Sequence, residues 1–119
     1  MANTFLSLTR DVCPASSGTP ETIFTVQTSK SIVVVGFTLC NIHSSGITVK
    51  VTQVSTTVQA GQTQNTTAHL TYDMPIPAGS SFEVCQGNKL IGNAGDIFKV
   101  DASVADKVSV VFNYMLQDL

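Results

Sequence analysis

The stretch SIVVVGFTLCNI, Ser31 to Ile42, decides the fold class of this chain. Its large apolar residues recur at every second position, as Val33, Val35, Phe37 and Leu39. A period of two is typical of a β-strand, in which alternate side chains share one face. The residues between them are also uncharged, which predicts a central strand that is covered on both sides.

The residues that follow predict a turn and a second strand. His43–Gly46 (HSSG) has the composition of a tight turn. In Ile47–Ser55 the apolar residues Ile47, Val49 and Val51 alternate with polar ones, which is typical of a half-buried antiparallel strand. We expect the two strands to pair as a hairpin.

Short apolar segments separated by turn residues continue along the chain, and no stretch has a sustained helical period. Val58–Thr67 is polar and is expected to be a loop. About eight short strands at intervals of about 8–12 residues predict an all-β chain folded as an antiparallel β-sandwich, either Ig-like or a jelly-roll. The other predicted strands are Thr22–Gln27, His69–Met74, Phe82–Cys85, Leu90–Ile91, Ile97–Ala102 and Val108–Met115.

The segment MPIPAG, Met74–Gly79, interrupts this series of strands. Proline has no amide hydrogen for a β-ladder, so Pro75 and Pro77 exclude a central strand and favour an edge or a crossover. Gly79 allows the backbone to turn before the next strand. The segment is expected to connect two strands, either within one sheet or between two sheets.

Composition excludes several classes of function. The chain has 119 residues, which is enough for one domain with one core, and only 12% of them are charged, about half the usual share. The six basic residues are scattered singly, so no nucleic-acid partner is expected. No apolar run approaches the length of a membrane span, and the first residues lack the pattern of a secretory signal. We therefore expect a protein that is made in a reducing cytoplasm.

The first 20 residues differ from the rest. The segment CPASSGTP, Cys13–Pro20, is linker-like, so residues 1–20 are predicted to be an extended N-terminal arm and residues 21–119 the β-sandwich domain. The three cysteines are expected to be free thiols that are mostly buried as small apolar groups, although a Cys40–Cys85 bridge is an alternative. Cys13, next to Pro14 in the arm, is expected to be the most exposed of the three.

No pattern of residues indicates an active site. Cys40 and His43 are three positions apart, which places them on opposite faces of a strand. Metal-binding spacings such as C-x-x-C or H-x-x-x-H are missing, and no cofactor is expected. Asp96 follows a glycine at the start of a strand, where an aspartate commonly accepts hydrogen bonds from nearby backbone amides. We expect that the protein is not an enzyme.

The stretch from Pro75 to Gln117 resembles small structural proteins of tailed-bacteriophage virions. The resemblance lies in a P-x-P-A-G-S-S turn, a G-N-K-L turn, an A-G-D-x-F-x-V strand and a final V-x-V strand, and it extends over about residues 30–116. It implies a non-enzymatic protein of the virion, which is a head decoration or cement protein or a component of the neck or tail. The residues that carry it are Pro75, Pro77, Ala78, Gly79, Ser80, Ser81, Gly87, Lys89, Leu90, Ala94, Gly95, Asp96, Val100 and Val108–Tyr114.

Such a protein would assemble with itself, as a trimer on a capsid or a ring at a neck, and with the major capsid or neck and tail proteins. Apolar residues near the two ends of the chain are the predicted contacts, although each could equally pack on its own domain. The alternative is a carbohydrate- or ligand-binding module, for which Tyr72 is the one candidate for an exposed aromatic platform. The predicted contacts are Phe5, Leu6, Leu8, Met115, Leu116 and Leu119.

Overall fold

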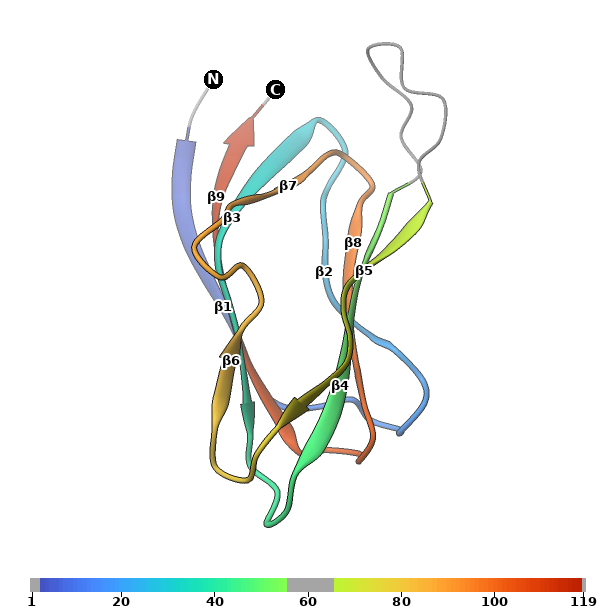
Figure 1. Ribbon diagram of the computed structural model, residues 1–119. Helices are drawn as coiled ribbons and strands as arrows, with labels where there is room; N and C mark the ends of the chain where they lie inside the picture. Colours follow the sequence, from blue (N-terminus) through green and yellow to red (C-terminus); the bar gives the residue numbers. More distant parts are fainter. Residues whose placement is uncertain (1–2, 56–65, 119) are drawn as a thin grey trace.

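The computed structural model describes residues 3–55 and 66–118, and within these residues all regular structure is β-strand (Figure 1). Residues 58–65 of the predicted loop lie outside the described part. The nine strands are β1 (Asn3–Cys13), β2 (Glu21–Thr25), β3 (Lys30–Asn41), β4 (Ile47–Val54), β5 (Thr67–Ile76), β6 (Ser81–Glu83), β7 (Leu90–Gly92), β8 (Ile97–Ala102) and β9 (Val108–Asp118).

The strands form two antiparallel sheets that pack face to face, as the sequence predicted (Figure 1). The five-stranded sheet has the order β1-β9-β3-β6, and β7 also pairs with β3. The four-stranded sheet has the order β2-β8-β4-β5. Apolar side chains from the two inner faces meet between the sheets and form the core.

The pairing of the strands is nested. β4 pairs with β5, β3 with β6 and β7, β2 with β8, and β1 with β9. The chain thus resembles one long antiparallel hairpin that is folded so that successive strand pairs lie alternately in the two sheets. If β6 and β7 are counted as one interrupted strand, this is the eight-stranded jelly-roll, so the structure selects the jelly-roll over the Ig-like alternative.

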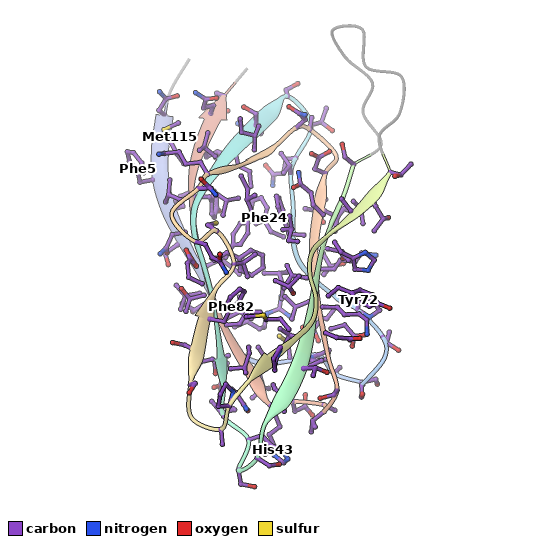
Figure 2. The ribbon with its side chains drawn as sticks, viewed as in Figure 1. Phe5, Phe24, His43, Tyr72, Phe82 and Met115 are labelled. Carbon is purple, nitrogen blue, oxygen red and sulfur yellow. The ribbon has the colours of Figure 1, made fainter. Side chains whose placement is uncertain are left out.

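Aromatic rings fill the middle of the core (Figure 2). The rings of Phe37 and Phe112 meet edge to face with their centroids 4.9 Å apart, and Phe98 lies 5.3 Å from Phe112. Phe24 from β2 stacks on Phe112 at 5.4 Å. Such pairs contribute stabilising free energy beyond that of the apolar area they bury. They hold the two sheets together in the middle of the sandwich.

A bulge in β3 changes which of its residues face the core. The ladder with β9 skips Val35, between Val34 and Gly36. Ile32 and Val34 therefore point inward before the bulge, and Phe37 and Leu39 point inward after it. The prediction that Val33 and Val35 share one face with Phe37 and Leu39 was wrong, because the extra residue reverses the alternation. The outer face of β3 is also not covered within the described chain, since Val35 is 43% exposed.

The predicted hairpin of Ser31–Ile42 with Ile47–Ser55 was also wrong. Both segments are strands, but β3 pairs with β6, β7 and β9, whereas β4 pairs with β5 and β8. The HSSG turn carries the chain from one sheet to the other. The buried Asn41 side chain holds this crossover: its amide nitrogen donates to the carbonyls of Ser45 (3.0 Å) and Ile76 (2.9 Å), and its oxygen accepts from the amide of His43 (2.8 Å).

The MPIPAG segment combines an edge strand with a crossover. Pro75 and Ile76 end β5, which lies at the edge of the four-stranded sheet, and the chain then passes to β6 in the other sheet. Gly79 has a φ of 73°, which lies in the left-handed region where glycine is unstrained. The interpretation as an edge and a connection between sheets is confirmed.

Residues 3–13 of the predicted arm form a strand of the sandwich. They are β1, which pairs with β9, so they belong to the same sandwich as the described residues 21–55 and 66–118. The alternation of Leu6 and Leu8 with polar residues is that of a strand, and Leu8 packs against the core. Cys13, expected to be exposed, is fully buried.

Candidate functional site

Four apolar side chains form a row across the outer face of the five-stranded sheet. In the register of the ladders, Phe5 of β1 lies opposite Met115 of β9, Met115 opposite Val33 of β3, and Val33 opposite Ile91 of β7. Directly opposed residues of an antiparallel sheet share one face. We call Phe5, Met115, Val33 and Ile91 the outer row.

The outer row is open to solvent at both ends. Phe5 is 74% exposed and Ile91 is 61% exposed, while Val33 and Met115 between them are half-buried. Figure 2 shows Phe5 and Met115 together on the outer side of the sheet. Two contacts that the sequence predicted from opposite ends of the chain are therefore brought side by side.

The row next to the outer row is neutral and contains Ser7, Asn113 and Gly36. The next row contains Thr9, Val111 and Thr38 and ends at Glu83 of β6, which lies opposite Thr38. A shallow hollow of about 300 Å³ lies beside the outer row. It is lined by Phe5, Leu6, Ser7, Val35, Asn113 and Tyr114.

Glu83 adjoins these rows from β6, but its carboxylate is engaged by the chain itself. It accepts hydrogen bonds from the amide of Phe37, at 2.9 and 3.1 Å, and from the hydroxyl of Thr38 at 3.3 Å. The amide of Phe37 lies next to the β3 bulge, where the ladder to β9 shifts. The carboxylate thus satisfies a backbone donor at the bulge instead of extending into solvent.

The other predicted contacts lie elsewhere. Leu8 and Leu116 are opposite the buried residues Phe112 and Ile32 and pack against the core. Leu6 is opposite Tyr114 on the inner side but remains 40% exposed. Leu119 lies outside the described residues. No signal in the sequence marked Val33 or Ile91, because the bulge that turns Val33 outward is not visible in the alternation.

The outer face of the four-stranded sheet has a different chemistry. Lys50 forms an ion pair with Asp73 (2.7 Å), and its ammonium lies 4.9 Å from the centroid of the Tyr72 ring. The hydrogen bond to Asp73 raises the pKa of Lys50. His69 meets Tyr72 edge to face at 5.0 Å. Tyr72 is 65% exposed, as predicted for the candidate aromatic platform, while Phe98 and Phe112 are buried in the core.

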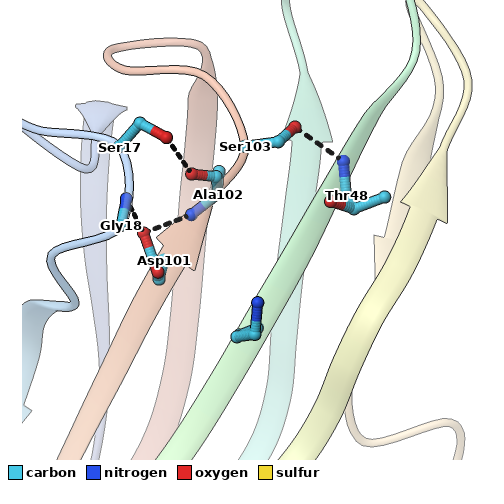
Figure 3. Close-up of a pocket in the computed structure, with 7 residues that line it drawn as sticks. Ser17, Gly18, Thr48, Asp101, Ala102 and Ser103 are labelled. Atoms are coloured by element: carbon cyan, nitrogen blue, oxygen red, sulfur yellow. Dashed lines mark hydrogen bonds between the residues drawn. The ribbon is translucent and has the colours of Figure 1, made fainter.

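A small polar pocket of about 140 Å³ lies at the end of the four-stranded sheet (Figure 3). The Asp101 carboxylate accepts hydrogen bonds from the amides of Gly18 (3.0 Å) and Ala102 (2.8 Å). The Ser17 hydroxyl donates to the Ala102 carbonyl at 3.1 Å. These bonds fasten the connection between β1 and β2 onto β8, and they use the polar groups that a ligand would need. We therefore assign this pocket a structural role.

The Asp96 carboxylate also has a structural role, as predicted. It is 1% exposed, and its Oδ2 accepts a hydrogen bond from the amide of Asn93 at 3.0 Å. Among residues 3–55 and 66–118, no group of three or more His, Cys, Asp or Glu side chains could hold a metal ion. The same residues include no helix long and apolar enough to span a membrane.

All three cysteines are free thiols, and two of them are buried. Burial raises the pKa of the Cys13 thiol to about 12, with the nearby Glu21 carboxylate adding to the effect. Burial likewise raises the pKa of Cys85 to about 11. A thiol reacts as its thiolate, so both are poor nucleophiles near neutral pH. Cys40 is half-buried on the outer face of β3, opposite Ser109 and Ser81.

Comparisons with known proteins give a likeness of fold. No family model matches the chain, and no curated protein matches it. Among solved structures, a chain from infectious bursal disease virus, Gx strain, superposes with a TM-score of 0.52 at 12% sequence identity. The match covers 96% of this chain and 32% of the viral one, so the chain spans about a third of the length of its structural neighbour. At this identity the likeness shows the shared β-sandwich fold alone.

Proposed function

We propose that this protein is a non-enzymatic structural component of a virus particle. The particle is that of a phage, and the protein lies on its head, neck or tail. On the head it would act as a decoration or cement protein. It assembles with itself and with other proteins of the particle, such as a major capsid protein or a neck or tail protein. The observation that carries the proposal is the exposed outer row on the five-stranded sheet, with a neutral row beside it.

The chemistry of this face supports a contact surface. Covering a charged side chain costs desolvation free energy, whereas covering apolar area is favourable by about 25 cal/mol per Å². The outer row and the neutral row of Ser7, Asn113 and Gly36 carry no charged residue, so a partner can cover them without burying an ion. The jelly-roll topology and the fold likeness to a virus chain support the particle as the place of that contact.

The test starts from purified particles of the virus that encodes the chain. Mass spectrometry should find the protein in the particles at a fixed stoichiometry. Particles assembled without it should bind the purified chain in a sedimentation assay. Its absence from the particles would contradict the proposal.

The contact face is tested by Ile91→Glu, because Ile91 is in the outer row but far from β1. We expect this variant to fold and to lose binding to the particle. The matched control is Thr25→Glu, which places the same charge at an exposed position of β2 in the other sheet and should bind normally. Equal binding by both variants would exclude the outer row as the contact.

One observation favours a second candidate, a carbohydrate- or ligand-binding module. Tyr72 is exposed beside Lys50, Asp73 and His69, and an aromatic ring next to polar groups can stack on a sugar. This role predicts saturable binding on a glycan array that Tyr72→Ala abolishes. An array without any binder would remove this candidate and leave the first one unaffected.

A further inference from the structure

The free edge of β1 is the longest sheet edge in the described chain. β1 lies at the end of the five-stranded sheet and pairs with β9 on one side only. From Asn3 to Arg10 its ladder with β9 has no register shift. An edge strand presents a row of unpaired amides and carbonyls, which is a template for another strand.

The other edges are protected by features that β1 lacks. β2 has five residues and a register shift between Thr22 and Phe24. β5 has two register shifts, a proline at position 75 and a left-handed residue, Asp73, with a φ of 51°. β6 and β7 have three residues each. Short strands, bulges and proline are the usual means by which proteins block edge-to-edge pairing.

Between Asn3 and Thr9 the β1 edge carries no proline, no glycine and no charge. Arg10 follows this stretch, but its guanidinium is held in an ion pair with Glu21 and contacts the Thr22 carbonyl. Lysine and other charges are a further means of blocking an edge, and none is placed here. The edge is therefore open to pairing.

We propose that β1 pairs antiparallel with β1 of a second copy of this chain, about a two-fold axis near Ser7. Pairing of this kind closes on itself. It covers the open β1 edge of both copies at once, and the edges that remain at the far ends of the joined sheet are the short strands β6 and β7. A strand from a different protein would cover β1 but add its own free edge.

The sequence of β1 is compatible with self-pairing. Registers centred on Phe5, Leu6 or Ser7 place no charged residue opposite another. With the centre at Ser7, Arg10 of one copy lies opposite Thr4 of the other, and the uncharged residues between them pair with each other. Like charges directly opposed would be destabilising, and this segment avoids them.

Pairing through β1 also places the two outer rows on one continuous face. With the centre at Ser7, Phe5 of each copy lies opposite Thr9 of the other, so each outer row continues into the partner's row that contains Thr9 and Val111. This inference deepens the proposed self-assembly and rests on it. It identifies the partner as a second copy and the unit as a two-fold pair, from which a trimer or ring would need further contacts.

The test uses opposite charges at Ser7, which is exposed on β1. Sedimentation velocity over a concentration series should show a dimer for the unchanged chain. Ser7→Lys and Ser7→Glu should each weaken that dimer by about tenfold or more, because like charges meet near the axis. An equimolar mixture of the two variants should restore the dimer. Restoration also shows that both variants are folded.

Thr25→Lys is the matched control, because it adds the same charge to the exposed edge strand of the other sheet. It should dimerise like the unchanged chain. Hydrogen exchange provides a second measurement: alternate amides from Thr4 to Thr9 should become protected as the dimer forms.

Three outcomes would overturn the inference. One is a monomer at every concentration, another is a trimer or ring that the Ser7 variants leave intact, and the third is protection of β1 only when particles are added. The proposed function is measured separately. A monomer found in virions would overturn the pairing alone, whereas a β1-paired dimer that is absent from virions would overturn the function alone.

Discussion

The two outer faces of this sandwich cover the same core but differ in chemistry. Across the four-stranded sheet, Lys50 pairs with Asp73 and lies over the ring of Tyr72. Across the five-stranded sheet, the outer row runs from Phe5 to Ile91 beside a row of neutral residues. One face carries ionic groups that favour contact with water, whereas the outer row on the other face could be covered without burying a charge.

This difference shows that alternation along a strand does not by itself say what an outer face is for. Both sheets place apolar residues inward at every second position, apart from the bulges. Their outward positions are free to be polar or apolar without loss of the core. The residue types at those positions therefore indicate what each outer face contacts. The following variants test this difference between the two faces.

The inward-facing pair of β3 before the bulge should have the largest effect, because both side chains are fully buried. Replacing Ile32 and Val34 together by alanine would remove two side chains from the core. Loss of their burial should lower the free energy of unfolding by about 3–6 kcal/mol, at about 1.5–3 kcal/mol for each side chain. Urea unfolding followed by circular dichroism measures this.

The control for this double substitution is Val35→Ala. It keeps the bulge and shortens a side chain that is 43% exposed, so the free energy of unfolding should stay within about 0.5 kcal/mol of the unchanged protein. If the double substitution were as mild as this control, Ile32 and Val34 would not face the core.

The next largest difference in the free energy of unfolding is expected between substitutions at two neighbouring residues of β9. Phe112 contacts four aromatic rings in the core, whereas Val111 faces outward and is 38% exposed. Phe112→Ala should cost about 3–5 kcal/mol of unfolding free energy. Val111→Ala should cost no more than about 0.5 kcal/mol. Equal losses, measured by chemical denaturation, would mean that β9 is covered on both sides within the monomer.

The reactivity of the three thiols should depend on whether they lie in the core or on an outer face. Cys40 lies on an outer face and should react with a thiol reagent in the native protein, while Cys13 and Cys85 should react only after unfolding. Mass spectrometry of the labelled protein gives the sites. Labelling of Cys13 at the rate of Cys40 would show that its end of β1 opens readily.

The same burial predicts the sign of a pH dependence. The pKa of Cys13 rises from its ordinary value of 9.0 to about 12 in the native state. Between these values the unfolded thiol has lost its proton and the native one has kept it, so the unfolded state binds fewer protons. The free energy of unfolding should therefore fall as the pH rises above 9.0. Cys13→Ala should reduce that slope in denaturation curves measured at alkaline pH.

The ion pair on the charged face should have the smallest effect. Lys50→Ala removes the contacts with Asp73 and Tyr72, but these groups are exposed and screened by water and salt. The denaturation midpoint should change little, and any change should shrink further at high salt. A large, salt-independent loss would show that this face is more rigidly built than its exposure indicates.

Much of the fold follows from the sequence, because the period of two in the apolar residues is a direct consequence of strand geometry. The strand Ile97–Ala102 was predicted with its observed bounds, and the edge position of Pro75 follows from its missing amide hydrogen. Which strands pair could not be derived in this way. The expected hairpin after Asn41 failed because a turn that crosses between sheets has the same composition as one within a sheet.

The candidate surface could be predicted only in part. Phe5 and Met115 were expected as contacts from their positions near the ends of the chain, and the register of β1 with β9 places them together. Val33 and Ile91 could not be expected. Their exposure depends on an extra residue at position 35 and on the pairing of β7 with β3, both of which are tertiary features.

The nested pairing also sets an order in time. β9 is the last of the nine strands to be synthesised, and it is the one that lies between β1 and β3 in the five-stranded sheet. Until residues 108–118 leave the ribosome, β1 has no neighbour and the outer row lacks Met115. Long-range pairing of this kind makes folding slow compared with local pairing. The surface proposed for assembly therefore forms only when the sandwich is complete. A partly synthesised chain does not yet present this surface to a particle.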